Sequence, residues 1–216
     1  MNPVPPSTTK HVSLACLSLI LAGTLALTGC DSTGANETPP DKTLSLTTVE
    51  NLPADPDTSS SSGRPQGYDQ FAFFDLQDST VVLSSEAPNR SDSASTEWDI
   101  AFRSTDIIVN GGPNGPGDGA ARVAKEAFQD VTDVTPDSLN HHSVEDWYTY
   151  NANGNHIIRP TAGRTLLVRT ADGEAYAKIR ILSYYKDAPD NPAESDQPSR
   201  YYTFEYVLQT DGTSFE

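Results

Sequence analysis

The chain has 216 residues and carries 30 acidic against 14 basic side chains, a formal net charge of −16. This length predicts one domain of ordinary size, with a core large enough to fold alone. The charge argues against a nucleic-acid role, because phosphate binding needs positive charge.

The first predicted element is an export leader. An apolar run from Val12 to Leu27 follows Lys10, and two small residues, Thr28 and Gly29, come directly before Cys30. The run is short for a membrane span, and small residues at its end are typical of a cleavage site. We therefore predict a lipoprotein signal peptide over residues 1–29 and a lipidated Cys30. An uncleaved anchor, or a secretory signal cut elsewhere, is the alternative.

Processing at Cys30 decides which metal ligands the mature chain keeps. The leader contains the only methionine, Met1, and one of the four histidines, His11. The second cysteine, Cys16, also lies in the leader, so no disulfide is expected in the mature domain. The imidazoles that remain are His141, His142 and His156.

Residues 30–67 are expected to form a flexible tether. Residues 31–67 contain no aromatic residue and are rich in proline and serine, a composition that cannot bury enough surface to offset the entropy of ordering. A short strand around residues 44–49 is an alternative within it. The folded domain is expected over residues 68–216.

Strand signals dominate this domain. Trp98, Ile100 and Phe102 alternate with polar or small residues and are expected on one face of a strand. The pair Asp172-Gly173 between two extended runs predicts a hairpin. The expected strands are 68–76, 80–84, 97–103, 106–110, 164–170, 174–185 and 200–209.

Three segments depart from the strand pattern. Residues 111–119 contain five glycines and predict a loop. Residues 121–131 place apolar side chains at helical spacing, so we expect one short helix there, with an irregular strand as the alternative. Residues 136–160 lack periodicity and predict a long functional loop. The fold class is therefore all-β and mostly antiparallel, with at most one short helix.

The last predicted strand presents Tyr202, Phe204 and Tyr206 on one face. Such a face could serve as a ligand platform. At strand spacing, aromatic residues are more often core, and we favour that interpretation.

Several short motifs of the domain resemble the HmuY family of bacterial surface lipoproteins. They are Trp98–Phe102, Asn110–Gly112, Ala177–Ile179, Ser183–Tyr185 and Tyr201–Tyr206. The resemblance implies an HmuY-like all-β domain at the outer membrane or cell surface. It also implies non-enzymatic binding of haem for iron acquisition, and transfer to an outer-membrane receptor. In the family's namesake two histidines are the axial iron ligands, and some relatives use methionine.

Candidate axial ligands in this chain are two of His141, His142 and His156. A six-coordinate haem iron takes its donors from opposite faces of the ring. Neighbouring residues in an extended segment point in different directions, so His141 or His142 together with His156 is the better pair. The alternative is that these histidines lie on the solvated surface of a HmuY-like lipoprotein that does not bind haem.

Other residues of the same segment suit a porphyrin site. Trp147, Tyr148 and Tyr150 could form apolar walls, and Arg159 or Arg164 could meet the propionates.

No other chemistry has a comparable pattern. The histidines with Glu145 or Asp146 could bind zinc, but no cysteine or HExxH pattern supports that site. The chain has no GxSxG nucleophile motif and no phosphate-binding GxxxxGK[ST] loop. We therefore expect a binding protein and not an enzyme.

Overall fold

The structure is a computed structural model that describes residues 44–59, 66–86, 94–152 and 155–216. The predicted leader and Cys30 lie outside these residues. The described residues form three antiparallel sheets, and their only helical structure is three single 3₁₀ turns, η1 (Phe128–Asp130), η2 (Pro136–Ser138) and η3 (Pro192–Glu194). The predicted all-β class is confirmed. None of the helices in this part of the chain is long and apolar enough to cross a membrane.

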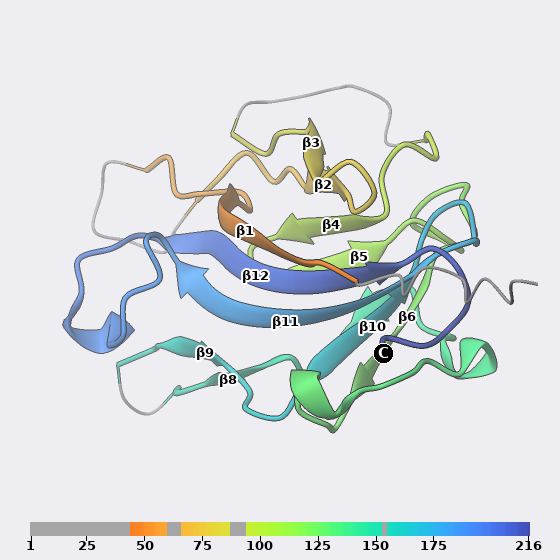
Figure 1. The fold of residues 1–216 in the computed structure, drawn as a ribbon. Coiled ribbons are helices and arrows are strands. Elements are labelled where there is room, and N and C mark those ends of the chain that lie inside the picture. Colours follow the sequence, from red (N-terminus) through yellow and green to blue (C-terminus); the bar gives the residue numbers. More distant parts are fainter. Residues whose placement is uncertain (1–43, 60–65, 87–93, 153–154) are drawn as a thin grey trace, which may run out of the picture. The chain divides into compact units, whose positions relative to one another are not determined.

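The larger of two main layers, sheet A, is built around the long C-terminal hairpin (Figure 1). Asp172 and Gly173 close the predicted turn between β10 and β11, and Gly173 takes the left-handed φ of +78° that glycine adopts readily. The order of strands is β1 (Leu46–Pro53), β12 (Ser199–Gln209), β11 (Tyr176–Tyr185), β10 (Thr165–Arg169) and β6 (Ala120–Ala124).

The strand β1 moves the expected domain boundary. Residues assigned to the flexible tether pair antiparallel with β12, with Val49 opposite Phe204. Leu52 at the end of β1 is only 2% exposed. The alternative of a short strand around residues 44–49 is therefore closer than the tether, and within the described residues regular structure begins at Leu46, upstream of Tyr68.

The second layer, sheet B, contains the N-terminal strands of the domain (Figure 1). A turn at Gln77-Asp78 joins the two strands of this sheet that come first along the chain. The order is β3 (Thr80–Leu83), β2 (Ala72–Asp75), β4 (Ile100–Arg103), β5 (Asp106–Val109) and β7 (Ser143–Val144).

An aromatic core holds the two sheets together. The ring of Phe204 in sheet A lies 5.7 Å from that of Phe74 and 5.3 Å from that of Phe102, both in sheet B. Tyr202, Phe204 and Tyr206 are each at most 1% exposed. These three residues are therefore core, as interpreted, and are not a ligand platform. The two tyrosines keep their hydroxyls satisfied by donating to backbone carbonyls.

The strand that contains Trp98 starts later than predicted. β4 begins at Ile100, so Trp98 leaves the alternation and packs with Ala101 and Phe73 on the opposite face from Ile100. Asp99 is also buried, and its two oxygens accept the backbone N–H groups of Leu76 and Ala171 at 2.9 and 2.7 Å. Because Asp99 lies in the sheet B segment and Ala171 in the β10–β11 turn, this carboxylate joins the two sheets.

The prediction of a helix over residues 121–131 is wrong, and the alternative, an irregular strand, is closer to the observed structure. Residues 120–124 are β6, paired with β10, and residues 128–130 are a single 3₁₀ turn. Ala121 packs in the main core, whereas Ala120 and Ala124 pack in a second cluster. Small residues buried on both faces of one strand produce an apolar spacing that resembles a helix.

The glycine-rich segment 111–119 is a loop, as predicted. It folds around the side chain of Asn110, whose Nδ2 donates to the Trp98 carbonyl at 2.8 Å and whose Oδ1 accepts from Gly117 N at 3.1 Å. A Cβ at Gly115 would lie 2.1 Å from that Oδ1. The glycines therefore allow the loop backbone to approach the fully buried side-chain amide of Asn110 closely.

The expected long loop over residues 136–160 is more regular than predicted. It contains η2, β7 and a third sheet, the hairpin of β8 (Tyr148–Tyr150) and β9 (Ile158–Pro160). Trp147 is 1% exposed and donates from Nε1 to the Thr105 carbonyl at 3.0 Å. That buried indole fixes the segment to the core.

Candidate functional site

His141 connects the edges of the two main sheets through its backbone. Its N–H donates to the Ala121 carbonyl at 3.1 Å, and its carbonyl accepts from Ala121 N at 2.7 Å. Ala121 belongs to β6 of sheet A, and β7 of sheet B follows at Ser143. The side chain of His141 remains exposed.

His142 braces the glycine-rich loop. Its Nδ1 lies 3.1 Å from the carbonyl oxygen of Gly119. The other ring nitrogen, Nε2, would lie 2.5 Å from a Cβ placed on Gly112, which has φ of +56°. Nδ1 therefore contacts the loop, and the ring of His142 packs closely against Gly112.

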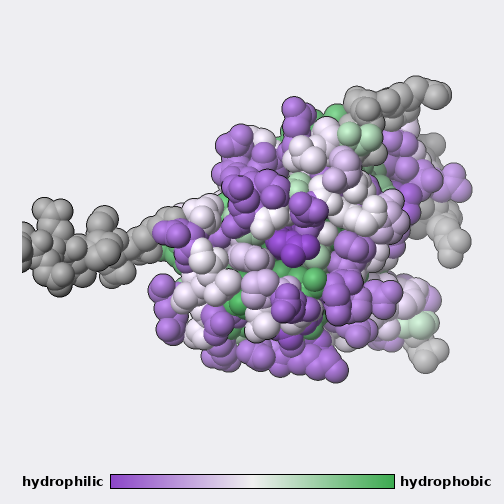
Figure 2. Space-filling view, turned by 90° about the vertical axis from the view of Figure 1, so that its right-hand side faces the viewer, coloured by the Kyte–Doolittle hydropathy of each residue, from purple (hydrophilic) through white to green (hydrophobic). Residues whose placement is uncertain are grey.

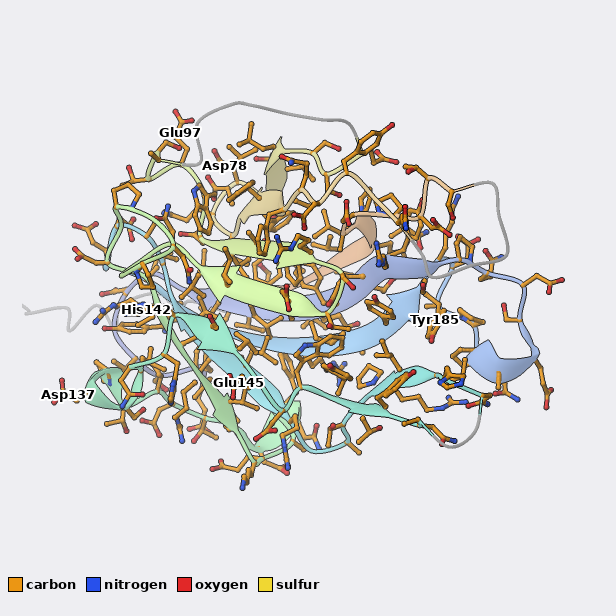
Figure 3. The ribbon with its side chains drawn as sticks, turned by 180° about the vertical axis from the view of Figure 1, so that it is seen from behind. Asp78, Glu97, Asp137, His142, Glu145 and Tyr185 are labelled. Atoms are coloured by element: carbon orange, nitrogen blue, oxygen red, sulfur yellow. The ribbon has the colours of Figure 1, made fainter. Side chains whose placement is uncertain are left out.

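His156 lies apart from the other two histidines. It precedes β9, and its Nδ1 is 2.7 Å from the hydroxyl of Tyr150 at the end of β8. In Figure 3, His142 lies at one end of the view, whereas the strands β8 and β9 lie toward the other end. The structure therefore does not bring His156 beside His141 or His142.

Two open grooves flank β7. The first, here the histidine groove, has a volume of about 500 Å³ and is lined by Arg122, Val123, Asn140, His141, His142 and Val144. The second, here the tyrosine groove, has a volume of about 800 Å³ and is lined by Phe71, Arg103, Ile107, Val144, Tyr148 and Tyr150. Both volumes are within the range of small-molecule sites, about 300–1,000 Å³.

The tyrosine groove combines apolar and acidic side chains. Ile107 and Ile108 of β5 and Val144 of β7 form part of the wall. Three carboxylates line the same groove, those of Asp106, Glu145 and Asp146.

Arg103 is the lining cation of the tyrosine groove. It pairs with Asp106 at 2.9 Å and with Asp69 at 3.0 Å, and its guanidinium lies 4.5 Å from the centre of the Phe71 ring. These contacts hold Arg103 in place and leave the groove with net negative charge.

The residues expected to surround a porphyrin lie in different parts of the fold. Tyr148 and Tyr150 line the tyrosine groove, but Trp147 is in the core. Arg159 donates to Asn191 Oδ1 at 2.9 Å, and Arg164 donates to a neighbouring backbone carbonyl. Neither arginine lines the tyrosine groove.

The sequence prediction missed Phe71 and Arg103 as site residues. Both are far from Tyr150 along the chain and reach the tyrosine groove only because β4 pairs with β5 and β5 with β7. A local signal did exist for the Tyr150–His156 contact, because the intervening Asn-Gly pair is a strong hairpin signal.

Metal sites built from three or more protein side chains are absent from the described residues. No group of at least three His, Cys, Asp or Glu side chains lies close enough there to hold an ion. The zinc set of histidines with Glu145 or Asp146 is therefore not assembled in this part of the chain.

The surface at the His142 end of the domain is mostly hydrophilic, with apolar area confined to a small central region (Figure 2). Comparison with known proteins adds no relative: no family model matches the sequence, and no curated protein matches it significantly. The fold and these grooves define the class, an acidic all-β domain with open grooves beside β7.

Proposed function

We propose that the protein is a lipid-anchored, HmuY-like binding module that captures haem or a related tetrapyrrole outside the cytoplasm. It would act without enzymatic chemistry at the outer membrane or cell surface and pass its ligand to an outer-membrane receptor. The observation that carries the proposal is the tyrosine groove, which is large, open and walled by Phe71, Tyr148 and Ile107.

The aromatic side chains of the tyrosine groove support a haem ligand. Haem supplies an iron centre that needs an axial donor, and imidazole and phenol oxygen are both known donors. Tyr150 lines the groove and is in contact with His156. Phe71, Ile108 and Tyr148 would contact the porphyrin ring.

The carboxylates that line the groove restrict the orientation of such a ligand. Asp106, Glu145 and Asp146 would repel two propionates inside the groove, and Arg103 is already paired. Since the groove is open, the propionates would extend into solvent, where their charge is screened.

The anchor completes the proposal. Acyl chains on Cys30 would hold the domain by burial of methylenes, each worth about 0.8 kcal/mol, so more than one chain gives stable attachment.

The second candidate is a surface lipoprotein that kept the fold but does not bind haem. It is favoured by the same three carboxylates and by the separation of His156 from His142. An acidic groove with two tyrosines and a phenylalanine suits a cationic or neutral ligand better than an anionic one.

A hemin titration of the full chain, purified in mild detergent, separates the two candidates. The haem-binding proposal predicts a near-stoichiometric shift of the Soret band. The same chain unfolded in urea is the control for adsorption and should show no such shift. An unshifted spectrum of the folded protein would instead support the second candidate.

A further inference from the structure

The tyrosine groove already holds one guanidinium group, that of its own Arg103. Asp69 and Asp106 pair with Arg103 at 3.0 and 2.9 Å, and the centre of the Phe71 ring lies 4.5 Å from the guanidinium carbon. Carboxylates and the face of an aromatic ring are the groups that recognise an organic cation. The surroundings of Arg103 therefore show, within the groove itself, how a cation is held there.

Glu145 and Asp146 offer the same chemistry without a cation. Both carboxylates line the tyrosine groove, and both residues are exposed. Each ion pair among the described residues joins an arginine to another carboxylate, so none of these pairs includes Glu145 or Asp146. The two side chains are thus free to pair with a positive group that a ligand brings.

Aromatic rings lie close to these carboxylates along the chain and line the same groove. Tyr148 and Tyr150 belong to β8, which follows Asp146 after the single buried residue Trp147. Tyr150 is 51% exposed, so its ring is open to a ligand. Because the face of a tyrosine ring attracts cations, this wall of the groove adds to the attraction of the carboxylates.

The charge of the whole chain favours the same class of ligand. The chain has a formal net charge of −16, and the tyrosine groove is lined by three carboxylates against one arginine. A field of this sign raises the local concentration of cations at low ionic strength and lowers that of anions. A cationic ligand is therefore favoured over a neutral one of the same shape, and a neutral one over an anion.

We propose that the tyrosine groove binds a small, flat organic cation, with its positive group at Glu145 and Asp146 and its planar part against the tyrosine rings of β8. Amidinium and guanidinium groups match the site best, because they are planar and donate to carboxylates in parallel pairs of hydrogen bonds. The inference rests on the part of the proposed function that both candidates share, a binding module that uses this groove, and it needs no haem.

Benzamidine, benzamide and benzoate test the inference because they have nearly the same shape and differ in charge. Each is titrated into the isotope-labelled full chain in mild detergent, and its affinity is taken from the backbone amide shifts at low and at high ionic strength. Benzamidine is expected to bind at least about tenfold more tightly than benzamide, and benzoate more weakly than either. The preference for benzamidine should shrink at high ionic strength.

The double variant Glu145→Gln, Asp146→Asn removes both charges and preserves the size of the side chains. It should bind benzamidine about fivefold more weakly than the wild type, and benzamide with unchanged affinity. Asp78→Asn combined with Asp137→Asn is the matched control, because these two carboxylates are exposed and line neither groove. The control should bind both compounds nearly as the wild type does.

The contribution of the aromatic wall is measured with Tyr150→Leu. This variant should weaken benzamidine binding by about threefold. Tyr68→Leu, at an exposed tyrosine outside the groove, is its control and should bind as the wild type does. Circular dichroism confirms that every variant is folded.

Equal affinity of the wild type for benzamidine and benzamide would overturn the inference, and so would unchanged benzamidine affinity in the double variant at Glu145 and Asp146. The hemin titration decides the haem proposal separately. A chain that binds hemin but not benzamidine refutes this inference and leaves the haem proposal standing. A chain that binds benzamidine but not hemin refutes the haem proposal alone, and a chain that binds neither refutes both.

Discussion

Replacement of Asp99 by alanine should destabilise the domain strongly. Asp99 is 4% exposed and accepts two buried backbone N–H groups, one from Leu76 and one from Ala171. Each buried donor left without a partner costs about 1–3 kcal/mol, which gives about 2–6 kcal/mol for the pair. Burial of the carboxylate is itself unfavourable and offsets part of this loss, so about 2–4 kcal/mol is expected.

Urea unfolding followed by tryptophan fluorescence measures this loss. Asp78→Ala, in the exposed β2–β3 turn that Figure 3 shows, is the matched control and should change the free energy of unfolding by less than about 0.5 kcal/mol. Asp99→Asn keeps one acceptor oxygen and should lie between the two. A loss below about 1 kcal/mol for Asp99→Ala would refute the view that this carboxylate joins the two sheets.

Three further predictions concern pH, the core and the anchor. Burial raises the pKa of Asp99 above its ordinary value of 3.8. The contribution of Asp99 to the free energy of unfolding is therefore complete below about pH 4, and it declines as pH rises through the folded-state pKa. The difference in free energy of unfolding between wild type and Asp99→Ala should therefore be larger at about pH 4 than at about pH 7. A difference that grows toward neutral pH would contradict a raised pKa for Asp99. Phe204→Ala should cost about 3–5 kcal/mol in urea unfolding, because Phe204 is fully buried between the sheets; an exposed-site control, Val81→Ala, should cost far less. Cys30→Ser should move the protein from the membrane fraction to the soluble fraction, and persistent membrane association would disprove lipid anchoring at this residue.

Local signals in the sequence predicted much of sheet A. The Asp172-Gly173 turn and the alternation of Tyr202, Phe204 and Tyr206 depend on neighbouring residues only, and both are found in the structure. The prediction for Trp98 failed because it assumed a strand from residue 97, whereas the register of β4 is set by its partners β2 and β5 and begins at Ile100.

Long-range pairing explains the other errors. β1 pairs with the edge of β12 and β6 with that of β10, and this pairing selects strands that the sequence offered only as alternatives. The tyrosine groove has the same origin. Phe71, Arg103 and Val144 belong to separate segments, and no spacing along the chain relates them to Tyr150.

The most direct test of the central claim is to map where a tetrapyrrole binds. Gallium protoporphyrin, which is diamagnetic, can be titrated into isotope-labelled protein while backbone amide shifts are followed by NMR. Binding in the tyrosine groove predicts the largest changes at Thr105, Ile107 and Ile108, which line that groove alone. Shifts confined to Arg122, Val123 and Asn140 of the histidine groove, or no shifts at all, would contradict the account.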